Sequence, residues 1–232
     1  MEIIADFIPR GRKNRPGLKL EPRWITVHDT ANTNPGADAL AHARYLKSEE
    51  AAKIPVSWHY TVDDKRIVQH LPLEEAGWHA GDGVKGEGNR SSIGIEICEN
   101  ADGDRAKAEE NAARLVAELL ERFGLDVERV VQHYRWSGKN CPRVLRGRAE
   151  GWSQFLETVR KNLKEHIFPD VPADHWAAEA IRFAKDNGLM LGEKGGMFYP
   201  EKPLTRAQMA VILKRFYLFL TSEGPPQNNL NF

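Results

Sequence analysis

The chain has 232 residues, which is enough for one large domain or two small domains with hydrophobic cores. Hydrophobic residues make up 41% and charged residues 28%, a balance typical of a folded globular protein rather than a disordered one. The 33 basic and 33 acidic side chains cancel, so no net field would attract nucleic acid. No apolar stretch approaches the roughly 18 residues that span a membrane, and two cysteines are too few for a disulfide framework.

The first part of the chain contains three predicted strands and one helix. Residues 1–23 are rich in proline, glycine and basic side chains and predict an irregular segment, apart from one short element close to its start. Residues 24–27 are β-formers and predict a central strand. Apolar residues at near-helical spacing predict an outer helix over residues 37–50. Two further strands, joined by a turn, are predicted at residues 56–62 and 66–70.

The middle of the chain continues this mixture of strands and helices. Small and β-branched residues alternate over residues 91–97 and predict a strand. Residues 106–123 carry apolar side chains down one face, and Gly124 fits the C-cap, so this stretch predicts a long helix. A short strand at residues 130–131 and a closing helix at residues 148–163 follow. Strands interleaved with helices predict an α/β fold with one sheet covered by helices.

A second, smaller unit begins near residue 167, after a charged connector. Residues 177–187 predict an amphipathic helix, which Gly188 ends. After a loop punctuated by glycine and proline, Thr205 fits the N-cap of a helix that reaches about residue 220. The tail, residues 223–232, is rich in proline and asparagine and is predicted to be disordered. The second unit is therefore predicted to be a small all-α module.

Two histidines and a cysteine are candidate metal ligands. His28 directly follows the strand predicted over residues 24–27, while His133 and Cys141 share one loop, with Lys139 two residues before the thiol. Three protein ligands that leave a fourth position for water are the pattern of a catalytic zinc site. On spacing alone another interpretation stays open, in which Cys141 is simply buried and the histidines pair with backbone carbonyls.

Several further motifs follow in a fixed order along the chain. They are Val27-His28-Asp29-Thr30, Ser57-Trp58-His59-Tyr60, Gly77-Trp78-His79-Ala80-Gly81, Asn89-Arg90-Ser91-Ser92-Ile93-Gly94-Ile95-Glu96 and Lys139-Asn140-Cys141-Pro142. With His133, this order resembles the zinc-dependent N-acetylmuramoyl-L-alanine amidases of type 2, which include phage and prophage endolysins and are related to peptidoglycan recognition proteins. The resemblance covers residues 1–162 and implies a central mixed sheet flanked by helices.

The resemblance also implies the residues of the site. His28, His133 and Cys141 would hold Zn²⁺ as the cofactor, Glu96 would act as general base, and Lys139 would stabilise the oxyanion. From the residues alone, Glu96 could instead face outward beside a cation, and Lys139 could be a solvated loop side chain.

A substrate groove lined by Trp78, His79, Asn89 and Arg90 is implied in the same way. Tryptophan offers a flat apolar face to a sugar ring, and Arg90 could meet a peptide carboxylate. His79, like His59, is predicted to be a cleft or packing residue rather than a further metal ligand.

The C-terminal unit, residues 163–222, resembles an S-layer homology module. The supporting residues are Phe168-Pro169-Asp170-Val171, Trp176 and Thr205-Arg206-Ala207-Gln208. Such modules commonly occur in threes and hold anionic secondary cell-wall polysaccharide, whereas the sequence shows one copy. The lone module would either associate with modules of other chains or serve as a helical appendage without carbohydrate binding. Arg206 is a candidate for binding an anion, with a plain surface arginine as the alternative.

These resemblances predict a two-part enzyme. Residues 1–162 would form a zinc amidase domain that cleaves the amide between N-acetylmuramic acid and L-alanine in peptidoglycan, and residues 163–222 would target the cell wall. The N-terminus lacks the basic-then-apolar order of a secretory signal. We therefore expect an endolysin that accumulates in the cytoplasm of the host and reaches the wall after the membrane is breached, with an exported enzyme as the alternative.

Two other functions stay open at this point. A peptidoglycan-binding protein without catalysis would keep the fold, although the retained Cys141 argues against it. A different zinc hydrolase, such as a peptidase that cuts within the stem peptide, would use the same metal site.

Overall fold

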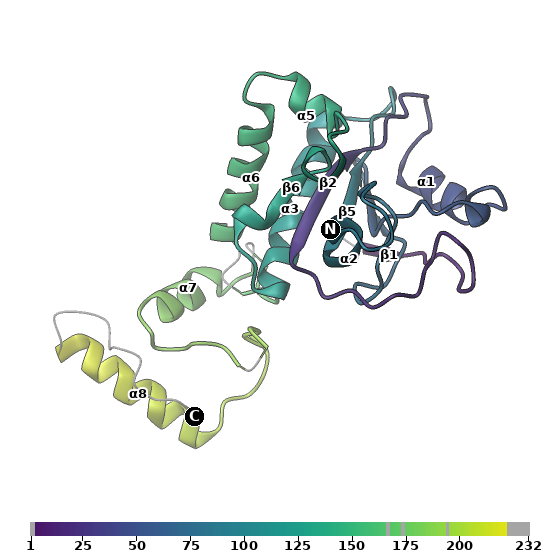
Figure 1. Ribbon diagram of the computed structural model, residues 1–232. Helices are drawn as coiled ribbons and strands as arrows, with labels where there is room; N and C mark the ends of the chain where they lie inside the picture. The colour runs from purple at the N-terminus through teal and green to yellow at the C-terminus, as the bar shows by residue number, and fades with distance from the viewer. Residues whose placement is uncertain (1–2, 166–167, 173–174, 194, 222–232) are drawn as a thin grey trace. The chain divides into compact units, whose positions relative to one another are not determined.

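The computed structural model describes residues 3–165, 168–172, 175–193 and 195–221 (Figure 1). Contacts within the chain divide it into two compact units, Met1–Asn162 and Leu163–Phe232. The tail predicted to be disordered, residues 223–232, lies outside the described residues.

The first unit is built on one six-stranded sheet. Its strands are β1 (Ile3–Ala5), β2 (Trp24–Asp29), β3 (Tyr60–Val62), β4 (Ile67–Gln69), β5 (Ser92–Ile97) and β6 (Val130–Gln132). They lie in the order β1-β4-β3-β5-β2-β6. The β2, β3, β5 and β6 strands pair in parallel, whereas β4 is antiparallel to β3 and parallel to β1. This mixed sheet, flanked by helices, confirms the predicted α/β fold class.

Side chains on β5 alternate between an apolar face and a polar face. The apolar face carries the three isoleucines of the strand, which are fully buried. The polar face carries Gly94 and Glu96, and β2 pairs beside it so that Thr26 lies opposite Gly94 and His28 opposite Glu96. The alternation therefore brings an imidazole and a carboxylate side by side on one face of the sheet.

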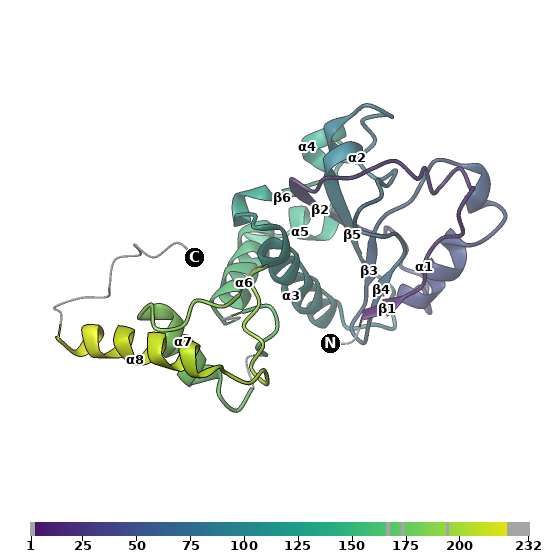
Figure 2. The same cartoon turned by 90° about the horizontal axis from the view of Figure 1, so that it is seen from below.

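Helices cover both sides of the sheet (Figures 1 and 2). The long α3 (Arg105–Phe123) packs against β3 and β5, and α6 (Gly151–Glu165) lies beside α3 in both views. On the other side lies α1 (Ala39–Leu46), whose buried alanines pack against Val68 of β4. The sheet is thus the middle layer of three.

The ends of α3 follow from its sequence. Asp104 caps the start, because its carboxylate accepts a hydrogen bond of 3.0 Å from the N–H of Lys107. Gly124 follows the last residue with a φ of 62°, a left-handed conformation that glycine adopts without steric cost. The predicted position of this helix is confirmed.

Several short elements were not predicted from the sequence. They are α2 (Glu87–Ser91), α4 (Tyr134–Ser137), α5 (Arg143–Gly147) and the 3-10 turns Ala51–Lys53 and Val127–Arg129. Each is too short to show a helical period of apolar residues. The predicted strand over residues 56–62 was wrong in its first half, because β3 begins at Tyr60 and the N–H of Ser57 donates instead to the carbonyl of Trp78.

The second unit is small and helical. It contains α7 (Ala178–Asp186) and α8 (Arg206–Thr221), at the two places where helices were predicted. The N-terminus of α8 is capped reciprocally, because Thr205 Oγ1 accepts from the N–H of Gln208 and the Thr205 N–H donates to Gln208 Oε1. Within the described ranges, no helix has the length and apolar character needed to cross a bilayer.

His59 is a fully buried histidine that the sheet holds in one neutral form. Its Nδ1 accepts a 3.0 Å hydrogen bond from the N–H of Gly94, and its Nε2 donates over 2.9 Å to the carbonyl of Glu75. Burial lowers the pKa of His59 from 6.5 to about 4. Because the pKa is depressed in the folded state, the stability this group contributes is fully present above pH 6.5 and is lost as the pH falls from 6.5 to about 4.

We predict that in His59→Gln the free energy of unfolding depends less on pH between pH 7 and pH 4. Glutamine can supply one donor and one acceptor but takes up no proton. Between pH 7 and pH 4 the wild type should lose about 3 kcal/mol more than the variant, since a pKa shift of one unit corresponds to roughly 1.4 kcal/mol. Urea unfolding at both pH values, followed by tryptophan fluorescence, measures this difference. Equal losses in the two proteins would contradict it.

Candidate metal centre and active-site cleft

Three side chains that can bind a metal converge at one end of the sheet. His28 lies on β2, His133 directly follows β6, and Cys141 lies in the loop after α4. One ligand atom from each lies within 4.8 Å of the others. The Nδ1 atoms of His28 and His133 are 3.0 Å apart, and Cys141 Sγ is 3.8 Å from His28 Nδ1. All three residues are buried, so their donor atoms face one another and not bulk water.

This donor set suits Zn²⁺. Two imidazoles and a thiol supply three protein ligands and leave one position open, as in catalytic zinc sites. Burial raises the pKa of the Cys141 thiol to about 12 and, together with the nearby histidines, lowers the pKa of His28. The neutral imidazole is the form that binds metal, and a coordinating thiol loses its proton to the ion.

Backbone and carboxylate contacts fix the loop that carries two of these residues. The N–H of His133 donates to the carbonyl of Val27, and the N–H of Tyr134 donates to the carbonyl of Cys141. Asp29, the last residue of β2, accepts a 2.7 Å hydrogen bond from the N–H of Val144 and pairs with Arg105 of α3. The loop is therefore tied to the strand that carries His28.

Glu96 stands one strand away from His28. Its Oε1 lies 3.9 Å from His28 Nδ1, and its buried Oε2 has no hydrogen-bond partner among the described residues. Burial and the charge of Asp29 raise the pKa of Glu96 well above its usual value. The outward-facing alternative for Glu96 is thus not what the structure shows, because the side chain lies on the polar face of the sheet beside His28.

A cleft of about 490 Å³ lies at this end of the sheet. His133, Glu96 and Lys139 line it, and so do Trp78 and His79. The ammonium of Lys139 also contributes to the lowered pKa values of His28 and His133. The cleft thus combines a metal-ligand candidate, a carboxylate and an ammonium in one cavity.

For two of the four residues predicted to line the substrate groove, the structure shows no side-chain group turned to a substrate. Asn89 lines the cleft, but its amide is bonded internally: Oδ1 accepts from the N–H groups of His79 and Ala80, and Nδ2 donates to the carbonyl of Gly83. Arg90 is half-buried and is not among the residues that line the cleft. Substrate contacts of both residues stay predictions, and Asn89 has a visible role in shaping the loop.

Other residues of the cleft were not singled out from the sequence. Most belong to loops, where no periodic pattern marks a wall of a cavity. They are Pro55, Val56, Gly83, Val84 and Ser137, whereas Trp58 and Gly81, which also line the cleft, belong to motifs quoted from the sequence.

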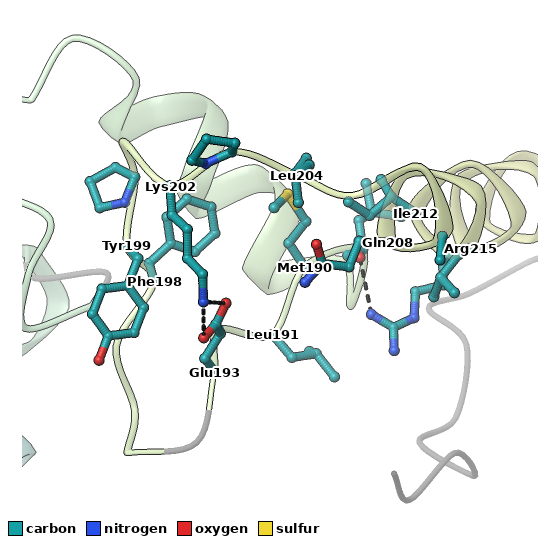
Figure 3. Close-up of a pocket in the computed structure, with 16 residues that line it drawn as sticks. Met190, Leu191, Glu193, Phe198, Tyr199, Lys202, Leu204, Gln208, Ile212 and Arg215 are labelled. Atoms are coloured by element: carbon teal, nitrogen blue, oxygen red, sulfur yellow. Dashed lines mark hydrogen bonds and ion pairs between the residues drawn. The ribbon is translucent and has the colours of Figure 1, made fainter.

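The second unit has a cavity of its own, of about 440 Å³ (Figure 3). Apolar side chains such as Leu204 and Ile212 line it, and the Lys202–Glu193 ion pair lies at its wall. The guanidinium of Arg215 donates to the carbonyl of Leu189. Arg206 is exposed and is not part of this lining, so its predicted contact with an anion stays a prediction.

Comparison with known families gives two matches. The family described as N-acetylmuramoyl-L-alanine amidase matches residues 18–144. The family described as S-layer homology domain matches residues 167–210.

Two curated relatives from Bacillus subtilis (strain 168) are similar to the first unit, and both carry the name N-acetylmuramoyl-L-alanine amidase. XlyA is 57% identical over 155 residues, which cover 67% of this chain and 50% of XlyA. CwlH is 53% identical over 157 residues, which cover 68% of this chain and 60% of CwlH. The chain therefore spans half to three fifths of the length of these relatives.

Solved structures show the same fold. The catalytic domain of XlyA matches with a TM-score of 0.64 and 56% identity, over 68% of this chain and 99% of that chain. The solution structure of the PlyG catalytic domain matches with a TM-score of 0.61 and 38% identity, over 70% of this chain and 96% of that chain.

We predict that Glu96→Gln stabilises the metal-free protein by about 1 kcal/mol at pH 8. The carboxyl is ionised in the unfolded chain at this pH, and folding moves it into a buried site beside Asp29. Because the folded pKa is raised above 4.5, the penalty appears as the pH rises above that value, so the gain should shrink at pH 5.

Urea unfolding in the presence of a chelator, at pH 5 and pH 8, measures this gain. Glu74→Gln is the matched control, since Glu74 is exposed and its removal should leave the unfolding energy unchanged. A Glu96→Gln protein no more stable than wild type at pH 8 would contradict the prediction.

Proposed function

The chain belongs to the N-acetylmuramoyl-L-alanine amidase family, and from this premise we propose that it is a zinc-dependent peptidoglycan hydrolase. It would cleave the amide bond between N-acetylmuramic acid and L-alanine. The observation that carries the proposal is the buried cluster of His28, His133 and Cys141, which meets Glu96 and Lys139 at one cleft. The names of the relatives XlyA and CwlH support the same reaction.

His28, His133 and Cys141 would hold the metal. When bound, Zn²⁺ supplies a Lewis acid and lowers the pKa of its water to about 7. The thiolate of Cys141 offsets one unit of the metal charge, so neighbouring side chains carry a larger share of the catalysis.

Glu96 would move the proton of the reaction. Its carboxylate faces the ligand cluster, and its free Oε2 is available to accept a proton from water and return it to the leaving nitrogen. A raised pKa brings a carboxyl nearer to neutral pH, where it can both accept and release a proton.

Lys139 would stabilise negative charge as it develops on the carbonyl oxygen. Its ammonium lies at the wall of the cleft and is already close enough to act on the pKa values of His28 and His133. Trp78 and the exposed Val84 also line the cleft and give it an apolar wall, against which a sugar ring or a peptide can pack.

The second unit would hold the enzyme at the cell wall. Its match to the S-layer homology domain supports this role, with anionic secondary polysaccharide as a ligand and Arg206 as a contact.

We also propose self-association through α8, because Leu213, Tyr217 and Leu220 form an exposed apolar stripe one and two turns apart.

The place of action stays a prediction. An endolysin would reach the wall from the cytoplasm of the host after the membrane is breached, and an exported enzyme would reach it through secretion. One solved structure among the matches, named a mutant endolysin from Bacillus subtilis, supports the route of an endolysin.

We predict that Cys141→Ser abolishes both zinc binding and wall hydrolysis. Serine is a poor zinc ligand, so the variant should retain much less than the roughly one zinc per chain expected of wild type. Lysis of purified cell walls should fall more than about 100-fold. Cys98→Ser is the matched control, because Cys98 is the other buried cysteine and lies outside the ligand cluster.

Mass spectrometry of the digested wall identifies the bond that is cut. A new free amino group on L-alanine supports the amidase, while one further along the stem peptide would show a zinc peptidase instead. A wild type without zinc that still binds peptidoglycan would overturn the enzyme and leave a recognition protein.

We predict that the full chain is larger than a monomer in sedimentation velocity and that Leu213→Glu shifts it toward the monomer. The reason is the cost of burying a carboxylate in an apolar contact. Lys214→Glu, on the neighbouring exposed position, is the control and should leave the sedimentation coefficient unchanged. A monomeric wild type at all concentrations would contradict self-association.

A further inference from the structure

A chain of hydrogen bonds leads from His28 into the sheet. Nε2 of His28 lies 3.0 Å from Nδ1 of His79, and Nε2 of His79 lies 3.2 Å from the backbone oxygen of Ser92. All three residues are buried. The other ring nitrogen of His28, Nδ1, faces His133 and Cys141. The two nitrogens of His28 therefore have separate partners.

The position of each proton in this series of hydrogen bonds follows from the backbone carbonyl of Ser92 at its end. A carbonyl oxygen can only accept, so Nε2 of His79 must carry the proton that is donated to Ser92. A neutral imidazole has one N–H, which leaves Nδ1 of His79 as an acceptor. Nε2 of His28 must then be the donor between the two rings. Nδ1 of His28 is left with a lone pair directed at the ligand cluster.

We propose that His79 is a positioning residue that fixes the tautomer and the ring orientation of His28 for metal binding. The inference rests on the proposed zinc site and gives His79 a role other than the substrate contact expected from the sequence. A metal-binding histidine needs an unprotonated nitrogen toward the ion, and its second nitrogen is usually held by a carboxylate, a carbonyl or water. Here the imidazole of His79 takes that place, and its own orientation is fixed by its hydrogen bond to the backbone carbonyl of Ser92.

The fold holds His79 firmly in this position. Its backbone N–H donates 2.8 Å to the side-chain oxygen of Asn89, which fixes the loop. Its ring lies against Gly94, where a Cβ atom would come within 2.7 to 2.8 Å of three ring atoms. Only a residue without a side chain leaves room for the ring at this point of β5. The ring of His59 packs on it edge to face, 5.9 Å between centroids.

The choice of imidazole has an electrostatic consequence. The site already contains Glu96 and the thiol of Cys141, which becomes a thiolate when it binds a metal. A carboxylate behind His28 would add a further buried negative charge beside Glu96, at a large cost in desolvation. A neutral histidine orients His28 without adding charge.

The first test is direct and needs neither zinc nor substrate. In metal-free wild type labelled with ¹⁵N-histidine, a two-bond ¹H–¹⁵N correlation spectrum shows which nitrogen of each ring carries the proton. We expect the proton on Nε2 for both His28 and His79. A proton on Nδ1 of His28 would overturn the inference and leave the zinc hydrolase untouched.

The second test separates positioning from packing. His79→Asn keeps an oxygen near the place of Nδ1, where it can accept from His28, whereas His79→Leu fills similar space without an acceptor. We expect zinc dissociation constants within about 5-fold of wild type for asparagine and about 10- to 100-fold weaker for leucine. A packing role predicts the reverse order, because leucine suits a buried site better than an amide does.

His70→Leu is the control for loss of a buried histidine. His70 is fully buried and bonds to Thr61, away from the ligand cluster, so its removal should leave zinc affinity unchanged. Equal zinc affinity of His79→Leu and wild type would overturn the positioning role alone. A wild type that takes up no zinc would overturn the proposed function and this inference together.

Discussion

The parallel pairing of β2 with β5 is the constraint on which the site depends. It sets His28 opposite Glu96, and because side chains alternate along a strand, the same register sends the isoleucines of β5 to the apolar core. One hydrogen-bonded ladder thus builds the hydrophobic layer and orients the reactive groups. The position of the loop that carries His133 and Cys141 depends on this pairing as well, because hydrogen bonds to Val27 and Asp29 hold the loop on β2.

Hydrogen bonds among buried polar groups stabilise the polar face of the sheet. Thr26 bonds to Ser92 and to Trp136, and His59 is bonded at both nitrogens. Among the described residues, the buried Oε2 of Glu96 at the candidate site has no hydrogen-bond partner. An unpaired buried group costs free energy, so its persistence at the ligand cluster is consistent with a chemical role.

Sequence patterns predicted most of the framework and part of the site. The period of α3 and its two caps are local properties, so the helix could be predicted with its C-cap at Gly124. The face on which Glu96 lies could not be, because it depends on pairing with a strand far away in the sequence. The same holds for His79, whose bond to His28 joins residues 51 positions apart. The role of Asn89 could not be predicted either, because the sequence shows the amide but not the backbone groups that form hydrogen bonds with it.

The two-faced register also determines where the chain can tolerate a change in length. A single residue inserted into β5 would move Glu96 into the core and an isoleucine into the cleft, so one event would damage packing and chemistry together. An insertion near Gly83 and Val84, which are exposed at the rim of the cleft, would shift neither strand. A change in loop length can therefore alter the shape of the cleft while β2 and β5 keep the same number of residues.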